Sequence, residues 1–585
     1  MKKLLVYLKD YKKESVLGPL FKLLEASFEL IVPLVIAAII DTGVANGDRA
    51  YVMKMCMVLV LLAVIGLTCS ITAQYFAAKA AVGFSTKLRH ALFEHIQTLS
   101  FSEMDTVGTS TLITRMTSDI NQVQNGVNLV LRLFLRSPFI VFGAMIMAFT
   151  VDVKAALVFV VTIPLLSVVV FGVMLVSIPL YKRVQNALDK VLGITRENLT
   201  GSRVIRAFNK EQDEMEHFNE SNDALTKVQL YVGKISALMN PLTYVIINGA
   251  IVVLVWAGAL RVDNGYITQG AVVALINYMS QILVELIKLA NLIININKSI
   301  ACGNRIESIF ELQSSIKEPE TTKTLPKEGG EVPEVEFSHV CLTYAQAGEE
   351  SLTDIDFTVK KGETIGVIGG TGSGKSSVVN LIPRFYDATK GSVKVEGRDV
   401  REYTLEDLRS RIGMVLQKAV LFKGTIRENM RWGNENATDE ELMQALEIAQ
   451  AKEFVDKKEG GLDFLVEQGG KNLSGGQRQR LTIARAIVKK PDILILDDSA
   501  SALDFATDAK LRMAIRDMEN RATVFIVSQR AASIMYADKI IVLDDGQVVG
   551  MGTHEELLAG CEVYQEIYYS QFKKSGDNEN AKEGR

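Results

Sequence analysis

Two adjacent carboxylates end an apolar run in the stretch PDILILDDSASALD, residues 491–504. An acidic side chain at the end of a buried strand is typical of a site that holds a metal ion or activates a water molecule. Asp497 fits the metal role. Asp498 is either a catalytic base or a carboxylate that cannot quite reach its water. The rest of the sequence has to supply the context.

A glycine-rich motif upstream matches the pattern G-x-x-x-x-G-K-[ST] and predicts a phosphate-binding loop. It follows the strand-like run TIGVIG and precedes the helical run KSSVVNLIPRFY. Backbone N–H groups and the helix N-terminus would face the phosphates of ATP. Lys375 would reach the β- and γ-phosphates, while Ser376 and Asp497 would hold Mg²⁺, the latter through water. The predicted nucleotide-binding residues here are Gly369, Gly370, Thr371, Gly372, Ser373, Gly374, Lys375, Ser376 and Ser377.

Size and composition indicate more than one domain. The chain has 585 residues, and its long apolar runs are confined to about the first half. A net charge of −4 argues against nucleic acid as a main partner. The five cysteines are scattered without a CxxC pair, so we expect small buried hydrophobic residues rather than a metal site or a disulfide framework.

Six segments are long and apolar enough to cross a bilayer, which needs about 20 residues per helix. They are residues 17–40, 53–78, 131–151, 155–180, 244–262 and 271–294. An even number of spans leaves both ends on one side, and the nucleotide motif makes that side the cytoplasm. The sequence therefore predicts an α-helical six-span transmembrane domain followed by an α/β P-loop nucleotide-binding domain, in a multi-pass protein of the cell membrane.

Long charged segments separate the second span from the third and the fourth from the fifth. We expect two helical excursions into the cytoplasm, each with a turn, at Gly108 and at Gly201. Basic residues in them agree with the positive-inside rule: Arg115, Arg196, Arg203, Arg206 and Lys210. The first 15 residues predict a short amphipathic helix on the cytoplasmic membrane surface.

Several polar residues fall inside the predicted spans. Glu25 and Glu29 share one helix face, Lys22 lies three residues before Glu25, and Glu285 and Lys288 are three apart. Such groups either line a substrate cavity or fix the packing of helices through ion pairs, and the sequence leaves both interpretations open. We also expect kinks at Pro33, Pro138 and Pro164.

Domain boundaries follow from composition. The predicted transmembrane domain, with its two cytoplasmic excursions, covers residues 1–312. A polar stretch rich in proline and glycine predicts a linker at residues 313–334. The nucleotide-binding domain would then occupy residues 335–572, and the polar residues 573–585 predict a disordered tail.

Between the two nucleotide motifs lies the stretch KNLSGGQRQRLTIARAI. Taken together in this order, the P-loop, LSGGQ and ILILDD resemble the ABC transporter ATPases. The stretch SALD at residues 501–504 resembles the family's D-loop, and the segment around Gln417 resembles its Q-loop, a candidate Mg²⁺ contact. Tyr344 resembles the aromatic residue that stacks on adenine.

The resemblance covers nearly the whole chain and is that of an exporter-type half-transporter. It implies that two such chains pair and that the excursions carry coupling helices near residues 105–110 and 196–201. Each ATP would lie between the P-loop of one subunit and the LSGGQ of the other. The signature residues that the resemblance assigns to the partner's nucleotide are Ser474, Gly475, Gly476 and Gln477.

Two positions depart from the family's hydrolytic pattern. Asp498 stands where hydrolytic subunits have Glu, and Gln529 stands where they have a switch His. An Asp carboxylate retreats by ~1 Å, and a displacement of that order costs about 10²-fold in rate. Gln hydrogen-bonds a phosphate but cannot carry a proton. A third departure, Glu467 and Gln468 before the signature, lies in a loop that contacts coupling helices in the family.

These departures favour a subunit of a heterodimeric exporter of drugs, other amphipathic compounds or lipids. Its own Walker site would bind ATP and hydrolyse it poorly, while its LSGGQ would complete the hydrolytic site of a second half-transporter. Two alternatives remain: a homodimeric exporter with slow ATPase activity, and a non-pumping, ATP-gated membrane sensor or regulator. The expected partners are the second subunit, membrane lipid and a small amphipathic substrate.

Overall fold

The computed structural model describes residues 3–322, 332–345, 347–499, 501–518 and 521–572. The chain divides into two compact units. Residues 1–97 and 110–312 form the first unit, and residues 98–109 and 313–585 form the second. The predicted tail, 573–585, and part of the predicted linker, 323–331, lie outside the described residues.

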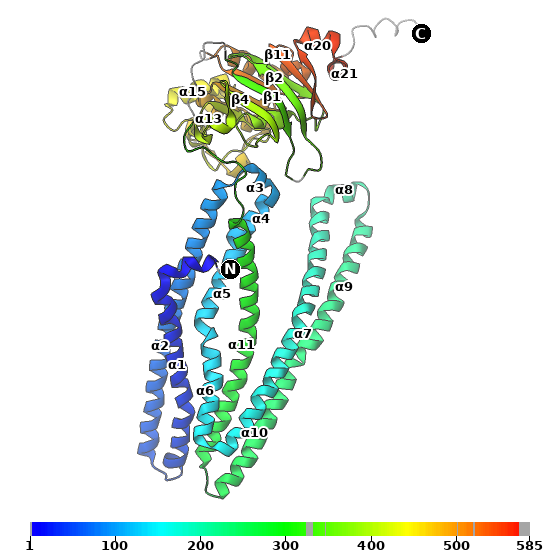
Figure 1. Ribbon diagram of the computed structural model, residues 1–585. Helices are drawn as coiled ribbons and strands as arrows, with labels where there is room; N and C mark the ends of the chain where they lie inside the picture. Colours follow the sequence, from blue (N-terminus) through cyan, green and yellow to red (C-terminus); the bar gives the residue numbers. More distant parts are fainter. Residues whose placement is uncertain (1–2, 323–331, 346, 500, 519–520, 573–585) are drawn as a thin grey trace. The chain divides into compact units, whose positions relative to one another are not determined.

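Six helical segments in the described residues are long and apolar enough to cross a membrane (Figure 1). This confirms the predicted number of spans. The 3-10 helix η1 (Lys3–Tyr11) occupies the predicted N-terminal helix. The following helices are α1 (Lys12–Ala38), η2 (Ile39–Val44), α2 (Arg49–Thr98), α3 (Phe101–Val107), α4 (Thr109–Thr114), η3 (Arg115–Asp119), α5 (Ile120–Leu129), η4 (Val130–Phe134), α6 (Arg136–Val151), α7 (Val153–Thr200), α8 (Ser202–Ala207), α9 (Glu211–Ala237), α10 (Met239–Asp263) and α11 (Gln269–Phe310).

The six long helical segments have 42 to 53 residues each, many more than a bilayer requires. Helix α7 has 48 residues, a length of about 72 Å at 1.5 Å per residue, against a hydrocarbon core of about 30 Å. Helix α7 packs along α9 and α10, and the short helix α8 connects α7 to α9 (Figure 1). Gly201 caps α7, so the predicted turn falls between α7 and α8. Pro33 and Pro164 lie inside continuous helices.

A charged cluster ties three helices of the first unit together. Arg136 of α6, 7% exposed, donates from Nη1 to Glu285 Oε1 of α11 at 2.8 Å and from Nη2 to Glu29 Oε2 of α1 at 2.6 Å. Ser137 Oγ and Lys288 Nζ also donate to the Glu285 carboxylate, each at 2.8 Å. These contacts match the interhelix ion pairing that the sequence allowed.

The backbone explains why two consecutive residues of α6 reach one carboxylate. The wide helical turn η4 ends at Phe134, and α6 begins at Arg136, two residues before Pro138. Proline has no N–H, so the helical hydrogen bond to the carbonyl four residues earlier is missing there. Arg136 and Ser137 are the first two residues of α6, and both are buried.

Replacement of Glu285 by Ala removes the main partner of a buried guanidinium. We expect a loss of stability of about 3 kcal/mol, the lower end of the cost of breaking a buried ion pair, because Arg136 loses the Glu285 carboxylate and keeps only that of Glu29. The measurement is the thermal unfolding of the detergent-solubilised protein.

The matched control is Glu311→Ala, which removes a carboxylate that is 59% exposed and pairs with exposed Lys3. An exposed pair contributes only about 0–1 kcal/mol. Equal effects of the two substitutions would contradict a structural role for the buried cluster.

The second unit contains a six-stranded sheet in the order β12-β11-β3-β10-β9-β6 and a four-stranded antiparallel sheet in the order β2-β1-β4-β5. Strands β7 and β8 form a separate pair. The strands are β1 (Val335–Leu342), β2 (Leu352–Val359), β3 (Thr364–Gly369), β4 (Lys390–Val395), β5 (Arg398–Asp399), β6 (Ile412–Val415), β7 (Gly424–Thr425), β8 (Leu465–Val466), β9 (Ile493–Asp497), β10 (Thr523–Val527), β11 (Lys539–Asp544) and β12 (Gln547–Gly552).

Helices cover the larger sheet and continue to the end of the described chain. They are α12 (Lys375–Leu381), α13 (Leu405–Ser410), α14 (Ile426–Arg431), α15 (Asp439–Ile448), α16 (Lys452–Asp456), α17 (Gly475–Val488), α18 (Phe505–Arg516), α19 (Ala531–Ile534), α20 (His554–Gly560) and α21 (Glu562–Gln571), with short 3-10 turns η5 (Val400–Glu402), η6 (Gly461–Asp463) and η7 (Gln468–Gly470). This mixed α/β unit, together with the six helical segments, confirms the predicted fold class.

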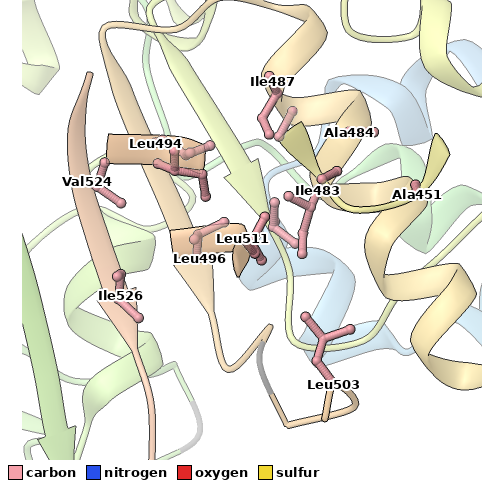
Figure 2. Close-up of a cluster of buried hydrophobic side chains, with 14 of the residues drawn as sticks. Ala451, Ile483, Ala484, Ile487, Leu494, Leu496, Leu503, Leu511, Val524 and Ile526 are labelled. Atoms are coloured by element: carbon pink, nitrogen blue, oxygen red, sulfur yellow. The ribbon is translucent and has the colours of Figure 1, made fainter. Parts of the chain in front are cut away.

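Strand β9 is buried on both faces. Leu494 and Leu496 join one apolar cluster, in which they lie close to Ile483 of α17 (Figure 2), and Ile493 and Ile495 join a second cluster. Successive side chains of a strand point to opposite faces, so the continuous apolar run is the pattern of a strand with helices or a sheet on both sides. The core therefore holds the strand that ends in Asp497.

Candidate nucleotide-binding site

The carboxyl ends of three parallel strands meet at one pocket of the second unit. Val527 of β10 is in register with Asp497 of β9 and with Val367 of β3. The pocket has a volume of about 340 Å³. Its lining consists of Tyr344, Ser351, Thr371, Gly372, Gly374, Lys375, Ser376, Ser377, Gln417, Asp497, Asp498, Val527, Ser528 and Gln529. Most of the predicted site residues thus come together in one place.

Glycines shape the phosphate-binding loop between β3 and α12. Gly374 has φ 91°, and a Cβ there would lie 2.6 Å from Leu352 Cδ2. A Cβ on Gly369 would lie 2.1 Å from the carbonyl oxygen of Leu543. These positions require glycine because of left-handed backbone or close approach. Gly369, Gly370 and Ser373 form the turn without lining the pocket.

The Lys375 ammonium is held inside this loop. Its Nζ donates to the carbonyl oxygens of Gly369, at 3.0 Å, and Gly370, at 2.5 Å. Burial lowers the pKa of Lys375, while the nearby carboxylates of Asp498 and Asp497 oppose that shift. A buried ammonium beside a glycine-rich loop suits the phosphates of a nucleotide, because an anion compensates the desolvated charge.

The predicted metal-binding pair is also assembled. Ser376 Oγ donates to Asp497 Oδ1 at 2.9 Å, and Asp497 is 4% exposed. Burial raises the pKa of Asp497, and the charge of Asp498 raises it further. The described residues contain no group of three or more His, Cys, Asp or Glu side chains that could hold a metal. The Ser376 hydroxyl and the Asp497 carboxylate are oxygen donors that fit Mg²⁺, with water and phosphate oxygens to complete its coordination.

Asp498 occupies the turn that follows β9. Its φ is 45°, and its backbone N–H donates to the Val527 carbonyl at 3.0 Å. The Gln417 side-chain amide donates to Asp498 Oδ2 at 3.4 Å. Gln529 follows β10 and lines the same pocket. Asp498, Gln529 and Gln417 therefore all line the same pocket.

Tyr344 lines the pocket from the turn after β1. Its hydroxyl donates to Ser377 Oγ at 2.9 Å, and its ring makes an edge contact with the Tyr386 ring, with centroids 5.0 Å apart. Sequence reasoning missed Ser351 and Ser528 as lining residues, because no motif marks them. It also missed the Tyr386 contact.

The signature residues stand apart from this pocket. Ser474 caps the N-terminus of α17, where its Oγ accepts from the Gln477 N–H at 3.3 Å and Gln477 Oε1 accepts from the Ser474 N–H at 3.1 Å. A Cβ on Gly476 would lie 3.0 Å from the Ala502 carbonyl. Among the described residues that line the pocket, none belongs to the LSGGQ stretch.

Comparison with known proteins identifies both parts of the chain. Residues 15–286 match the ABC transporter transmembrane region family, and residues 352–501 match the ABC transporter family. An uncharacterized ABC transporter ATP-binding protein of Mycobacterium bovis is 37% identical over 568 residues, covering 97% of both chains. The ATP-dependent lipid A-core flippase of Desulfotalea psychrophila is 33% identical over 485 residues, covering 83% of this chain and 84% of that protein.

A solved structure shares the fold. A bacterial Atm1-family ABC exporter with ATP bound has a TM-score of 0.78 to this chain, with 97% of this chain and 99% of that chain covered. The two sequences are 21% identical, so this likeness shows the fold alone.

The position of Tyr344 leads to a test of nucleotide binding. Tyr344→Ala removes an aromatic platform worth about 1–3 kcal/mol per stacked base, so we expect ATP affinity to fall about 5- to 150-fold. Tyr344→Phe keeps the ring, loses the hydrogen bond to Ser377 and should change affinity by less than about fivefold. Equilibrium titration with a fluorescent ATP analogue measures both. Equal losses would contradict the stacking role.

Proposed function

Because the chain belongs to the ABC transporter family, as an exporter-type half-transporter, we propose that it is one subunit of a heterodimeric exporter. It is a multi-pass membrane protein with a cytoplasmic nucleotide-binding domain and ATP-driven translocase activity. In the proposed complex, the Walker site of this chain binds ATP for long periods and hydrolyses it slowly. Its LSGGQ completes the hydrolytic site of the partner subunit.

One observation carries the proposal. Asp498 and Gln529 line the same pocket as Lys375, Ser376 and Asp497. The three residues suited to binding Mg²⁺ and phosphate are in place, whereas the two residues suited to activating water and carrying a proton are replaced. We therefore expect this site to bind ATP but to hydrolyse it slowly.

The chemistry follows from the reach and charge of the two side chains. The Asp498 carboxylate is shorter than that of Glu by one methylene, and a shift of ~1 Å in a reacting group costs about 10²-fold. The Gln529 amide can donate to a phosphate oxygen but cannot become cationic. Because these losses act on the transition state rather than on ground-state binding, we expect turnover to fall with little loss of ATP affinity.

The substrate in this proposal is a small amphipathic compound or a lipid. The lipid A-core flippase among the relatives supports a lipid or lipid-like cargo. The membrane half offers six apolar helical segments with the charged cluster of Arg136, Glu285 and Lys288 among them. Vesicles that contain the complex should show ATP-dependent movement of a fluorescent lipid or dye.

The purified chain alone should hydrolyse ATP at least about 10²-fold more slowly than the complex with its partner subunit, since both ATP sites of a homodimer would use the poor Walker residues of this chain. Asp498→Asn should change turnover of the complex little. Asp498→Glu combined with Gln529→His should raise the ATPase rate of the isolated chain. Lys375→Ala in that double variant is the control and should abolish the gain. Steady-state phosphate release measures all four.

Two outcomes would contradict the proposal. The first is rapid hydrolysis by the chain alone, at the rate of the complex. The second is recovery of only the homodimer when the natively expressed protein is analysed by native mass spectrometry, which would favour the slow homodimeric exporter.

A second structural feature bears on how the site communicates with the first excursion. Helix α3 belongs to the same compact unit as the nucleotide-binding residues. The Tyr386 hydroxyl donates to Asp105 Oδ2 of α3 at 2.6 Å, and Phe101 of α3 packs on Phe385 with ring centroids 4.7 Å apart. Tyr386 also contacts the ring of Tyr344 in the pocket. Tyr386 therefore connects the nucleotide pocket with the proposed coupling helix.

Tyr386→Phe removes this hydrogen bond and keeps the ring contacts. A hydrogen bond to a charged group contributes about 1.5–3 kcal/mol, so we expect the stimulation of ATPase activity by an amphipathic dye to fall at least about tenfold in the complex. If the hydrogen bond is responsible, Asp105→Asn in the Tyr386→Phe background should add little. Fully additive effects would show that the two side chains act separately.

A further inference from the structure

A side chain from the last described helix holds the backbone that carries Gln529. The Nε2 of Gln571, at the end of α21, donates to the Gln529 carbonyl at 2.7 Å. The Oε1 of the same amide accepts from the Ala531 N–H at 2.9 Å. One planar amide thus pairs with the main chain on both sides of Arg530, as a neighbouring strand would. Gln571 does not line the nucleotide pocket.

The clamped segment is tied in turn to the D-loop. Arg530 Nη1 donates to the Leu503 carbonyl and Nη2 to the Ser501 carbonyl, each at 3.2 Å. The Arg530 guanidinium also lies 5.1 Å from the ring centroid of Phe505. Gln571 thus bonds the backbone of Gln529 directly. It is connected to the loop before α18 through the neighbouring Arg530.

Helix α21, which ends at Gln571, is docked on the second unit through a buried side chain. Tyr564 of α21 is fully buried, and its hydroxyl lies 2.8 Å from His554 Nδ1 of α20. Helix α21 packs against α19, β3 and β11. Gln571 lies seven residues beyond Tyr564, about two helical turns along the same helix.

We propose that Gln571 is a positioning residue for this nucleotide site. By fixing the carbonyl of Gln529 and the N–H of Ala531, it holds the Gln529 side chain in the pocket wall and keeps the D-loop in place through Arg530. The C-terminal helix thereby slows the release of bound ATP. This inference rests on the proposed function in that a slowly hydrolysing site retains ATP long enough for its release rate to matter.

The test compares two glutamines of the same helix. Gln571→Ala removes both hydrogen bonds to the segment that carries Gln529. Gln565→Ala is the matched control, because its Nε2 donates to the Leu558 carbonyl of α20 at 2.8 Å and does not contact that segment. Gln571→Glu is a near-isosteric third variant, which keeps an acceptor for the Ala531 N–H and places a carboxylate against the Gln529 carbonyl.

The readout is the release rate of a fluorescent ATP analogue from the full-length chain, measured by stopped flow beside the thermal unfolding of each variant. Loss of two modest hydrogen bonds predicts release about 5- to 30-fold faster for Gln571→Ala. We expect Gln571→Glu to release the analogue at least as fast as Gln571→Ala does. Gln565→Ala should release it at the wild-type rate. Release at the wild-type rate from Gln571→Ala would overturn the inference, and so would equal acceleration by Gln565→Ala at an equal loss of thermal stability.

The two proposals fail in different ways. The same substitution is introduced into the Asp498→Glu, Gln529→His double variant, whose turnover reports on the geometry of this segment whatever the wild-type site does. There Gln571→Ala should lower the ATPase rate and Gln565→Ala should not. Fast hydrolysis by the wild-type chain overturns the proposed function alone, while an unchanged rate on Gln571→Ala in this background overturns the positioning role alone.

Discussion

The geometry of the nucleotide site depends on one backbone hydrogen bond, from the Asp498 N–H to the Val527 carbonyl at 3.0 Å. It joins the ends of β9 and β10, whose last residues, Asp497 and Val527, are already in register. After this bond the segment that follows β9 turns into the pocket wall, while the Ser528 N–H after β10 still donates to the Val367 carbonyl of β3 at 3.0 Å. The two adjacent carboxylates therefore have different surroundings. Asp497 is buried against Ser376, whereas Asp498 lies in the pocket wall beside Gln417.

Much of this arrangement could be predicted because short stretches of sequence indicate it. Six apolar segments, a buried strand ending in an acid and a glycine-rich loop between a strand and a helix each identify themselves within about 25 residues. Parallel strands then bring their carboxyl ends together without further information. This is why Lys375, Asp497, Gln417 and Gln529 meet in one pocket as expected. These residues can be placed from the sequence because the geometry of a parallel sheet fixes where its strands end.

The contacts that escaped prediction join residues far apart in sequence. The pairs three residues apart, Lys22 with Glu25 and Glu285 with Lys288, follow from helical spacing. Arg136 is the central cation of the membrane cluster, yet its partner Glu285 lies 149 residues away. Gln571 reaches the Gln529 carbonyl across 42 residues and no motif marks it. A side chain that pairs with a distant backbone group can only be found once the elements are packed.

The surroundings of these residues are consistent with the proposal that this site binds ATP and hydrolyses it slowly. The groups suited to binding are built into the fold: the Lys375 ammonium bonds two loop carbonyls, and Ser376 bonds the buried Asp497. Replacement of Lys375 or Ser376 would remove hydrogen bonds to the loop or to the end of β9. Asp498 and Gln529 instead lie directly after strands β9 and β10, outside the apolar core. The left-handed backbone of Asp498, with φ 45°, is also one that Asp adopts more readily than most residues, because its short polar side chain relieves the strain. In the proposed function, an Asp at this turn would therefore cost the fold little, while its shorter side chain would withdraw the carboxylate from the attacking water. In the proposed function, binding would therefore depend on the phosphate-binding loop and the end of β9, and hydrolysis on the turns that follow β9 and β10.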